Sequence, residues 1–293
     1  MRFLLTGRDG QVGTELRRSL APLGEVTALA RAELDLADAG AIRAAVREHR
    51  PDWIVNAGAY TAVDKAESEA GLAQAVNGEA PALLAEEAAR LGARLVHYST
   101  DYVFDGTATR PYREDDPTHP VSSYGRSKLA GEQAVMAATG GHLVLRISWV
   151  YAARGRNFLL TMLRLAKERP ELRVVCDQYG APTWSRDIAD ATAALIRLQA
   201  WRGTAPGPAL YHLSAGGRTT WHQFAERIVE EGARRGLCPA LPVRAIATSE
   251  FPTPARRPAN SVLSNERLMA DYGLRLPSWE HSLPRCLDEV AAA

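Results

Sequence analysis

The stretch "RFLLTGRDGQVGTEL", residues 2–16, decides the fold expected for this chain. Its apolar run at residues 2–6 predicts a buried strand, and residues 11–20 continue with the periodicity of a helix. Between them, Gly7, Gly10 and Gly13 are spaced as GxxGxxG. Glycines at such a turn let backbone N–H groups approach a pyrophosphate at the start of the helix. A tight turn without a ligand explains the three glycines alone equally well, so the neighbouring motifs have to decide.

Strand-like and helix-like segments alternate through the first half of the chain. Further strands are predicted at residues 25–29, 53–56, 94–99 and 143–148, separated by helical segments that include residues 38–49. This alternation predicts an α/β fold with a Rossmann-type, doubly wound parallel sheet covered by helices on both faces. We assign residues 1–150 to this nucleotide-binding domain, with about 186–212 returning to it. About 151–185 and 213–293 are expected to form a smaller, mixed α/β substrate-binding domain.

The composition narrows the expected partners and the compartment. The 35 basic and 34 acidic residues are interspersed and give a net charge of +1, so no one-sided field attracts nucleic acid or an anionic membrane. No apolar run approaches the roughly 18 residues of a membrane span, and the first residues do not read as a signal peptide. Three widely separated cysteines without CxxC suit a reducing compartment, and the histidines form no metal-binding cluster. We therefore expect a cytoplasmic protein without a structural metal.

Tyr124 and Lys128 form a second motif, YxxxK, within "SSYGRSK", residues 122–128. Only three lysines occur in the chain, so such a match is expected by chance roughly 0.1 times. Positions i and i+4 share one face of a helix, and Ser122 or Ser123 is a suitable N-cap. An ammonium beside a phenol lowers the phenol pKa from about 10 toward neutrality. We expect Tyr124 to exchange protons with a substrate; an incidental helix pair is the alternative.

Four residues follow predicted strands at their carboxyl ends: Gly7, Asn56, Thr100 and Trp149. Doubly wound sheets bind ligands in the crevice outside these ends, so we expect the four to meet in one cleft. Each residue taken singly is also compatible with an ordinary loop. Trp149 would offer a flat apolar face to a ligand, with core packing as its other interpretation.

The end of the second strand reads Ala30 and Arg31, where a carboxylate often holds the ribose hydroxyls of NAD. With a guanidinium there and no carboxylate to repel it, a 2′-phosphate should be tolerated. We therefore expect NADPH to be used at least as well as NADH. The alternative is that Arg31 is a solvated surface residue.

Together these motifs resemble the extended short-chain dehydrogenase/reductases. Further stretches are similar to one family among them, the dTDP-4-dehydrorhamnose reductases: "GQVGTEL", "VNAGAYTAVDKAES", "STDYVFDG", "DQYGAPT" and "PTPARRPANSVL". The similarity runs from residue 3 to about residue 285. It implies NAD(P)H-dependent reduction of the 4-keto group of dTDP-6-deoxy-L-lyxo-4-hexulose to dTDP-L-rhamnose, a step of nucleotide-sugar and cell-surface polysaccharide biosynthesis.

The resemblance also implies roles for individual residues. Thr100, Tyr124 and Lys128 match the catalytic triad, with Tyr124 as proton donor. The implied cofactor positions are Gly7, Gly10, Gln11, Val12, Gly13, Arg31, Asp35, Leu36, Ala59, Tyr60, Thr61, Tyr98, Tyr124 and Lys128. The implied substrate positions are Thr100, Asp101, Trp149, Asn157 and Arg257, the last two near the nucleotide diphosphate. Some family members carry an aspartate at the end of the second strand, and this chain does not, so the adenosine-ribose contact is the least defined.

Other functions stay open on the sequence. The chain could reduce another dTDP-4-keto-deoxysugar, or act as a sugar-nucleotide epimerase or dehydratase; dehydratases place an acid pair beside the Thr, whereas "STDYVF" offers Asp101 alone. A non-catalytic NADP-binding regulatory subunit, such as that of methionine adenosyltransferase, or a dinucleotide sensor would not need the Thr, Tyr and Lys set. Relatives include homodimers, some bridged by Mg²⁺. The sequence leaves a homodimer open and has no acidic cluster that indicates the ion.

Overall fold

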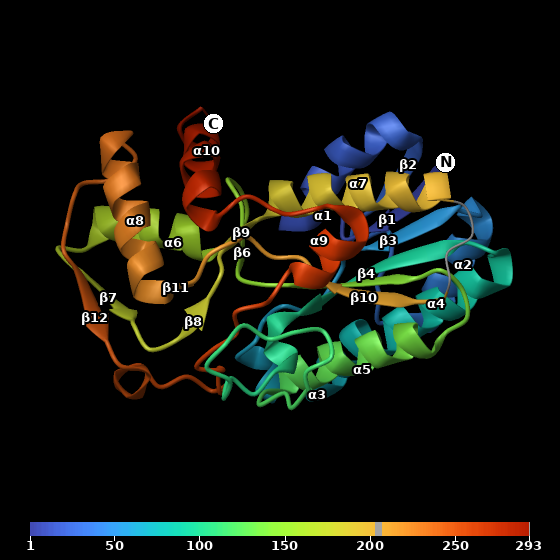
Figure 1. The fold of residues 1–293 in the computed structure, drawn as a ribbon, viewed down its shortest axis with the longest axis horizontal. Coiled ribbons are helices and arrows are strands. Elements are labelled where there is room, and N and C mark those ends of the chain that lie inside the picture. Colours follow the sequence, from blue (N-terminus) through green and yellow to red (C-terminus); the bar gives the residue numbers. More distant parts are fainter. Residues whose placement is uncertain (203–206, 293) are drawn as a thin grey trace.

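Six parallel strands form the central sheet of the computed structural model, which describes residues 1–202 and 207–292 (Figure 1). In spatial order they are β10 (Ala209–His212), β5 (Leu143–Ile147), β4 (Arg94–Thr100), β3 (Trp53–Asn56), β1 (Arg2–Thr6) and β2 (Glu25–Leu29). Every predicted strand lies within one residue of an observed one. The doubly wound α/β fold is therefore confirmed.

Helices cover both faces of this sheet (Figure 1). On one face lie α1 (Gln11–Leu20) and α7 (Ser185–Arg202); on the other lie α2 (Ala39–His49), α4 (Ala80–Leu91) and α5 (Ser123–Ala137), with α3 (Ala70–Gln74) and a π-helical turn (Ala75–Glu79) before α4. Successive strand residues point to opposite faces, so Phe3 and Leu5 pack in the core beneath α1, while Leu4 packs in the core beneath α2 and α4. Both faces are buried, which explains the uninterrupted apolar strands.

A second group of elements packs around its own core beside the carboxyl ends of the strands (Figure 1). It contains α6 (Phe158–Glu168), α8 (Trp221–Arg234) and α10 (Trp279–Ala291). Three short strand pairs accompany them: β6 (Val150–Tyr151) with β9 (Thr183–Trp184), β7 (Leu172–Val175) with β12 (Val243–Ile246), and β8 (Tyr179–Gly180) with β11 (Thr219–Thr220). The short helix α9 (Glu266–Tyr272) packs against β10 instead.

The chain returns to the sheet after this second group begins. Helix α7 packs against α1, and β10 pairs with β5 in a register that places Ala209 opposite Leu143. Residues 203–206, which lie inside the segment expected to return, are outside the described residues.

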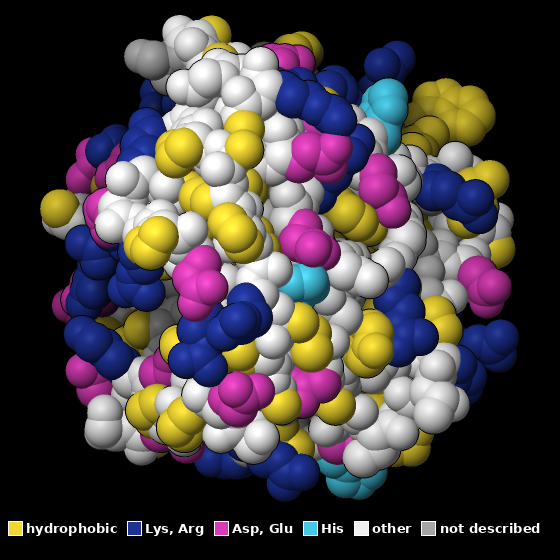
Figure 2. Space-filling model, turned by 90° about the vertical axis from the view of Figure 1, so that its left-hand side faces the viewer, with side chains coloured by type: hydrophobic (Ala, Val, Ile, Leu, Met, Phe, Trp, Pro, Cys, Tyr) yellow, Lys and Arg dark blue, Asp and Glu magenta, His cyan; other side chains and the backbone are white. Residues whose placement is uncertain are grey.

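The surface carries charges of both signs. On the face drawn in Figure 2, Lys and Arg side chains are interspersed with Asp and Glu side chains. Among residues 1–202 and 207–292, no helix has the length and apolar character that crossing a membrane requires. Within the same ranges, no group of three or more His, Cys, Asp or Glu side chains is placed to hold a metal ion.

Candidate active site

A cavity of about 860 Å³ opens at the carboxyl ends of β1, β3 and β4. Nearly all predicted site residues line it: Gly7, Gly10, Gln11, Val12, Arg31, Asp35, Leu36, Ala59, Tyr60, Thr61, Tyr98, Thr100, Asp101, Tyr124, Lys128, Trp149 and Asn157. Gly13, Arg257 and Asn56 are the predicted residues that do not. We call Gly7, Thr100, Tyr124 and Lys128 the sheet wall of this cleft, and Trp149, Phe158 and Trp221 its aromatic wall.

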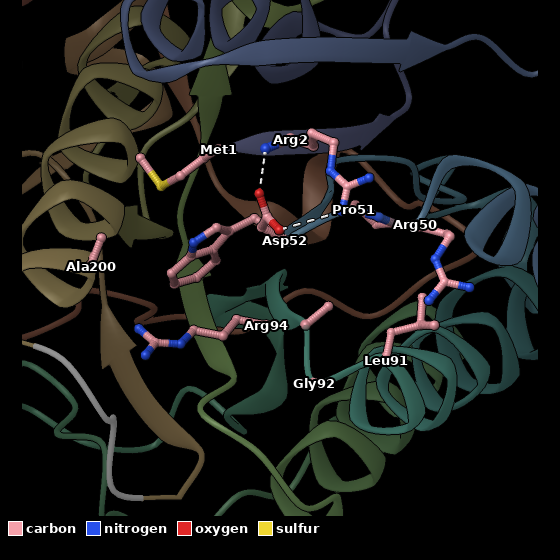
Figure 3. Close-up of a pocket in the computed structure, with 11 residues that line it drawn as sticks. Met1, Arg2, Arg50, Pro51, Asp52, Leu91, Gly92, Arg94 and Ala200 are labelled. Atoms are coloured by element: carbon pink, nitrogen blue, oxygen red, sulfur yellow. Dashed lines mark hydrogen bonds and ion pairs between the residues drawn. The ribbon is translucent and has the colours of Figure 1, made fainter.

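A smaller cavity of about 320 Å³ lies at the opposite end of the strands, beside the amino ends of β1, β3 and β4 (Figure 3). Asp52 turns toward Arg2 and accepts a hydrogen bond of 2.7 Å from the Arg2 backbone N–H, and Arg50 and Arg94 lie on either side. None of the predicted site residues lines this cavity. The larger cavity is therefore the candidate site.

The glycine turn fits a dinucleotide pyrophosphate. Gly7 has φ +70°, and a Cβ at Gly13 would lie only 2.0 Å from the Gly7 carbonyl oxygen, so Gly13 acts by letting α1 approach the turn rather than by lining the cavity. Gly10 caps α1 without a side-chain hydrogen bond, and no acidic residue lies in the first turn. The backbone N–H groups in the first turn of α1 therefore have no side-chain partner at the cap, and together with the positive end of the helix dipole they suit an anion. The side-chain oxygen of Gln11 is buried without a hydrogen-bond partner.

Helix α5 brings Tyr124 and Lys128 to the cleft from one face. The Ser122 hydroxyl caps the helix by accepting the Gly125 N–H at 3.1 Å, which confirms the predicted cap. Lys128 is only 3% exposed, and its Nζ donates to the Tyr98 carbonyl oxygen at 2.5 Å. Burial lowers the pKa of Lys128 to about 7. The ammonium is thus held in place and close to its titration point.

The expected lowering of the Tyr124 pKa is wrong in this structure. Burial raises the pKa of Tyr124 to about 12, and a hydrogen bond with Thr100 offsets only part of that rise. The reason is that burial removes water from around the phenolate, and the nearby negative charge of Asp101 raises the pKa further. Tyr124 is consequently a neutral phenol near pH 7, the form that a proton donor needs.

Thr100 and Asp101 lie together at the end of β4. The Thr100 hydroxyl donates to Asp101 Oδ1 at 3.1 Å, and Ser148 donates to Oδ2 at 2.9 Å. Asp101 is 2% exposed, and burial raises its pKa to about 6 although Ser261, Ser148 and Thr100 hydrogen bonds act in the opposite direction. The cleft therefore contains, next to Thr100, a carboxyl group that is protonated more readily than an ordinary aspartate.

Two strand residues contribute differently from expectation. The hydroxyl of Tyr98 donates to Thr192 of α7 at 2.8 Å, and the contact of Tyr98 with the catalytic set is made by its carbonyl oxygen, which accepts from Lys128. Asn56 does not reach the cleft: its amide accepts from Thr6 at 2.6 Å and donates to His97 at 3.1 Å inside the sheet. The expectation that Asn56 joins the site is therefore wrong.

The coenzyme side of the cleft contains residues that the sequence analysis missed. Asn77, in the π-helical turn, binds both the N–H and the carbonyl of Tyr60 at 2.9 Å and so fixes the loop at Ala59–Thr61. Near Arg31, the Glu33 carboxylate accepts the Ala30 N–H at 2.8 Å and pairs with Arg8 at 2.9 Å. A carboxylate is thus present at the end of β2 after all, but it is paired with Arg8.

Asn157 and Arg257 make contacts within the protein. Asn157 caps α6 by accepting the Leu160 N–H, and its amide donates to the carbonyls of Ala152 and Arg154. Arg257 pairs with Asp64 at 2.9 Å and does not line the cavity. Their predicted role near a diphosphate stays a prediction.

The aromatic wall joins residues distant in sequence. The rings of Trp149 and Trp221 are stacked with centroids 3.5 Å apart and planes 2° apart, and Phe158 lies 4.6 Å from Trp221. Sequence analysis missed Trp221 and Phe158. The capping box of Thr220 and Gln223 marks the start of α8, but nothing local indicates that this helix lies beside Trp149.

Comparisons with known proteins identify the family of this chain. The family model described as "RmlD substrate binding domain" matches residues 1–292. A dTDP-4-dehydrorhamnose reductase of Burkholderia thailandensis is 52% identical over 99% of both chains. Solved dTDP-4-dehydrorhamnose reductases of Clostridium acetobutylicum (36% identity, TM-score 0.92, 99% of both chains) and of Bacillus anthracis in complex with NADP (35%, TM-score 0.90, 98% of this chain and 99% of that one) share the fold. The chain therefore belongs to the dTDP-4-dehydrorhamnose reductase family.

Proposed function

We propose that this protein reduces the 4-keto group of dTDP-6-deoxy-L-lyxo-4-hexulose to give dTDP-L-rhamnose, and that it uses NADPH as reductant at least as well as NADH. The observation that carries the proposal is that Thr100, Tyr124 and Lys128 meet in one cavity with the glycine turn, where no side chain caps α1. Relatives of 52% and 36% identity that bear the reductase name support the choice of reaction. A relative solved with NADP supports the choice of coenzyme.

Tyr124, Lys128 and Thr100 have separate roles in the proposed reduction. NADPH, when bound, supplies a hydride to the carbonyl carbon. The neutral phenol of Tyr124 donates its proton to the carbonyl oxygen, and Lys128, with its pKa near 7, returns a proton to the phenolate. The Thr100 hydroxyl, which donates to Asp101 in the structure, turns its single proton to the same oxygen as negative charge builds, a contribution on the order of 3 kcal/mol.

The proposed binding regions follow the two walls. We propose that residues 1–150, with about 186–212, hold the coenzyme, and that about 151–185 and 213–293 bind the sugar nucleotide. The three cysteines are free thiols, which supports the proposed location in the reducing cytoplasm. The intact Thr, Tyr and Lys set argues against a purely regulatory NADP-binding subunit.

A coupled assay tests the reaction. The protein is incubated with dTDP-4-keto-6-deoxyglucose, a 3,5-epimerase and NADPH, while absorbance at 340 nm is followed and the product is identified by NMR. We expect NADPH oxidation and dTDP-L-rhamnose only when the epimerase is present. Oxidation without the epimerase would assign the enzyme to a different dTDP-4-keto sugar, and no oxidation under either condition would contradict the proposed activity.

A further inference from the structure

Trp149 has a strained backbone. It lies between β5 and β6 with φ +44°, and it is one of two non-glycine residues with positive φ in the described ranges. A bulky residue rarely adopts this left-handed conformation, which persists only where the surroundings impose it. Strain of this kind concentrates at ligand sites.

Both faces of the Trp149 indole are covered. A Cβ at Gly180 would lie 2.2 Å from Cε2 of Trp149 and 2.5 Å from its Cζ2 and Nε1, so the Gly180 backbone lies directly against one face. Those three indole atoms are the nearest atoms to that position, so Trp221, stacked at 3.5 Å, must cover the opposite face. The flat face expected to receive a sugar is therefore occupied by Trp221.

The two covers differ in their freedom to move. Gly180 is part of the strand pair of β8 and β11, and its neighbour Tyr179 is held through hydrogen bonds with Ala259 and Ser261. The backbone of Trp221 is likewise anchored, because the capping box of Thr220 and Gln223 starts α8 there. The Trp221 ring is only partly buried, and the Phe158 ring meets it at a 45° tilt instead of stacking flat against it. Rotation of the Trp221 side chain is thus the motion that uncovers Trp149.

A ring cannot enter between the indoles as they stand. Carbon atoms in contact lie about 3.5–4.0 Å apart, so a sugar ring between two indoles requires a separation of roughly 7 Å or more. We propose that Trp221 is a movable cover of the sugar-binding face of Trp149, which turns away when the hexulose ring binds. This inference rests on the proposed function. A 6-deoxy-sugar suits the exchange because its apolar carbons replace the contact that Trp221 gives up.

Fluorine NMR of protein labelled with 5-fluorotryptophan tests this inference on the intact chain. The six tryptophans should give six resonances, and the variants W149F and W221F assign the two that matter. With NADP⁺ present, saturating dTDP-L-rhamnose should move the Trp149 and Trp221 resonances by about 1 ppm or more, because their mutual ring-current shift is lost. The resonances of Trp53, Trp184, Trp201 and Trp279 serve as internal controls and should move much less.

The possible results distinguish failure of the movable-cover inference from failure of the proposed function. dTDP alone should leave the stacked pair unchanged, since the base and diphosphate do not need the Trp149 face; an equal shift with dTDP alone overturns the assignment to the sugar. Calorimetric binding of dTDP-L-rhamnose without movement of the Trp221 resonance overturns the movable cover and leaves the proposed function intact. Absence of both binding and NADPH oxidation overturns both.

Discussion

The two walls of the cleft are built in different ways. The sheet wall carries hydroxyl, phenol and ammonium groups that backbone carbonyls and buried side chains hold in place, as Tyr98 holds Lys128. The aromatic wall consists of stacked rings that contact one another without a hydrogen bond between Trp149 and Trp221 among the described contacts. Hydrogen bonds fix positions to within tenths of an ångström, whereas ring faces can be exchanged for other apolar surfaces. In the proposed function, the rigid wall carries out the chemistry and the adaptable wall accommodates the sugar.

A buried ion pair supports the sheet wall from beneath. Glu132, one turn after Lys128 on α5, pairs with Arg146 of β5, and their side chains are 5% and 3% exposed. Removing one partner leaves an uncompensated buried charge. The largest effects on the sheet wall should therefore come from this pair rather than from surface charges.

Glu132→Gln should lower the free energy of unfolding by about 3–5 kcal/mol, measured by urea denaturation. The matched control is Glu168→Gln, which breaks the exposed pair with Arg164 and should change stability by less than about 1 kcal/mol. Equal effects of the two substitutions would show that the buried pair does not support the sheet wall.

Tyr124→Phe should lower kcat for the proposed reduction by at least about a hundredfold, because the proton donor is lost. The Kd for NADPH, measured by fluorescence titration, should stay within about twofold, since the ring remains. Tyr211→Phe, whose hydroxyl donates to Asp271 outside the cleft, should retain its rate. A rate near that of the wild type in Tyr124→Phe would remove this residue from the mechanism.

His212 should make the stability of the sheet region depend on pH. Its Nε2 accepts from Arg146 at 3.2 Å, and burial together with Arg146 lowers its pKa to about 3. Between pH 6.5 and about 3, His212 is protonated in the unfolded chain but neutral in the folded protein. The free energy of unfolding therefore falls as the pH falls, by up to about 1.4 kcal/mol per pH unit. His212→Gln removes this titrating group, so the difference in the free energy of unfolding between pH 7 and pH 5, measured by urea denaturation, should become smaller by up to about 1.4 kcal/mol per pH unit. An unchanged slope would show that His212 is already protonated in the folded protein.

Gly180→Ala should disturb the aromatic wall alone. The added methyl would meet the Trp149 ring, which Trp221 blocks on its other side, so KM for the dTDP-sugar should rise about tenfold while the Kd for NADPH changes little. Gly216→Ala is the control in the same region, because its Cβ would have no neighbour nearer than 3.7 Å. If Gly180→Ala weakens NADPH binding as strongly as sugar binding, the two walls are not independent.

Arg31→Ala should give the smallest effect, at the rim of the sheet wall. An exposed guanidinium contributes up to about 1 kcal/mol to an ion pair, so kcat/KM with NADPH should fall roughly fivefold and that with NADH should stay nearly constant. Parallel initial-rate measurements with the two coenzymes decide this. A stronger preference of the wild type for NADH would contradict the role of Arg31.

The parts of the site that were predictable share a physical property: their positions depend on local sequence. The strand ending at Thr6, the glycine turn and α1 follow from apolar periodicity and from glycine spacing, and the shared face of Tyr124 and Lys128 follows from helix geometry. The Tyr124 pKa was predicted in the wrong direction because desolvation depends on everything packed around the ring. Asn56 was misplaced for a related reason, since its partners Thr6 and His97 are 50 and 41 residues away.

By itself, the sequence determined the order of the elements, the position of the glycine turn and the residues that α5 presents together, because backbone sterics and side-chain periodicity act over a few residues. Only the tertiary structure decided that Trp221 covers Trp149, that Arg257 pairs with Asp64 and that Arg146 neutralises Glu132. Such pairs depend on how whole elements pack, and packing is set by the summed burial of many side chains from distant segments. No short stretch of residues carries that sum.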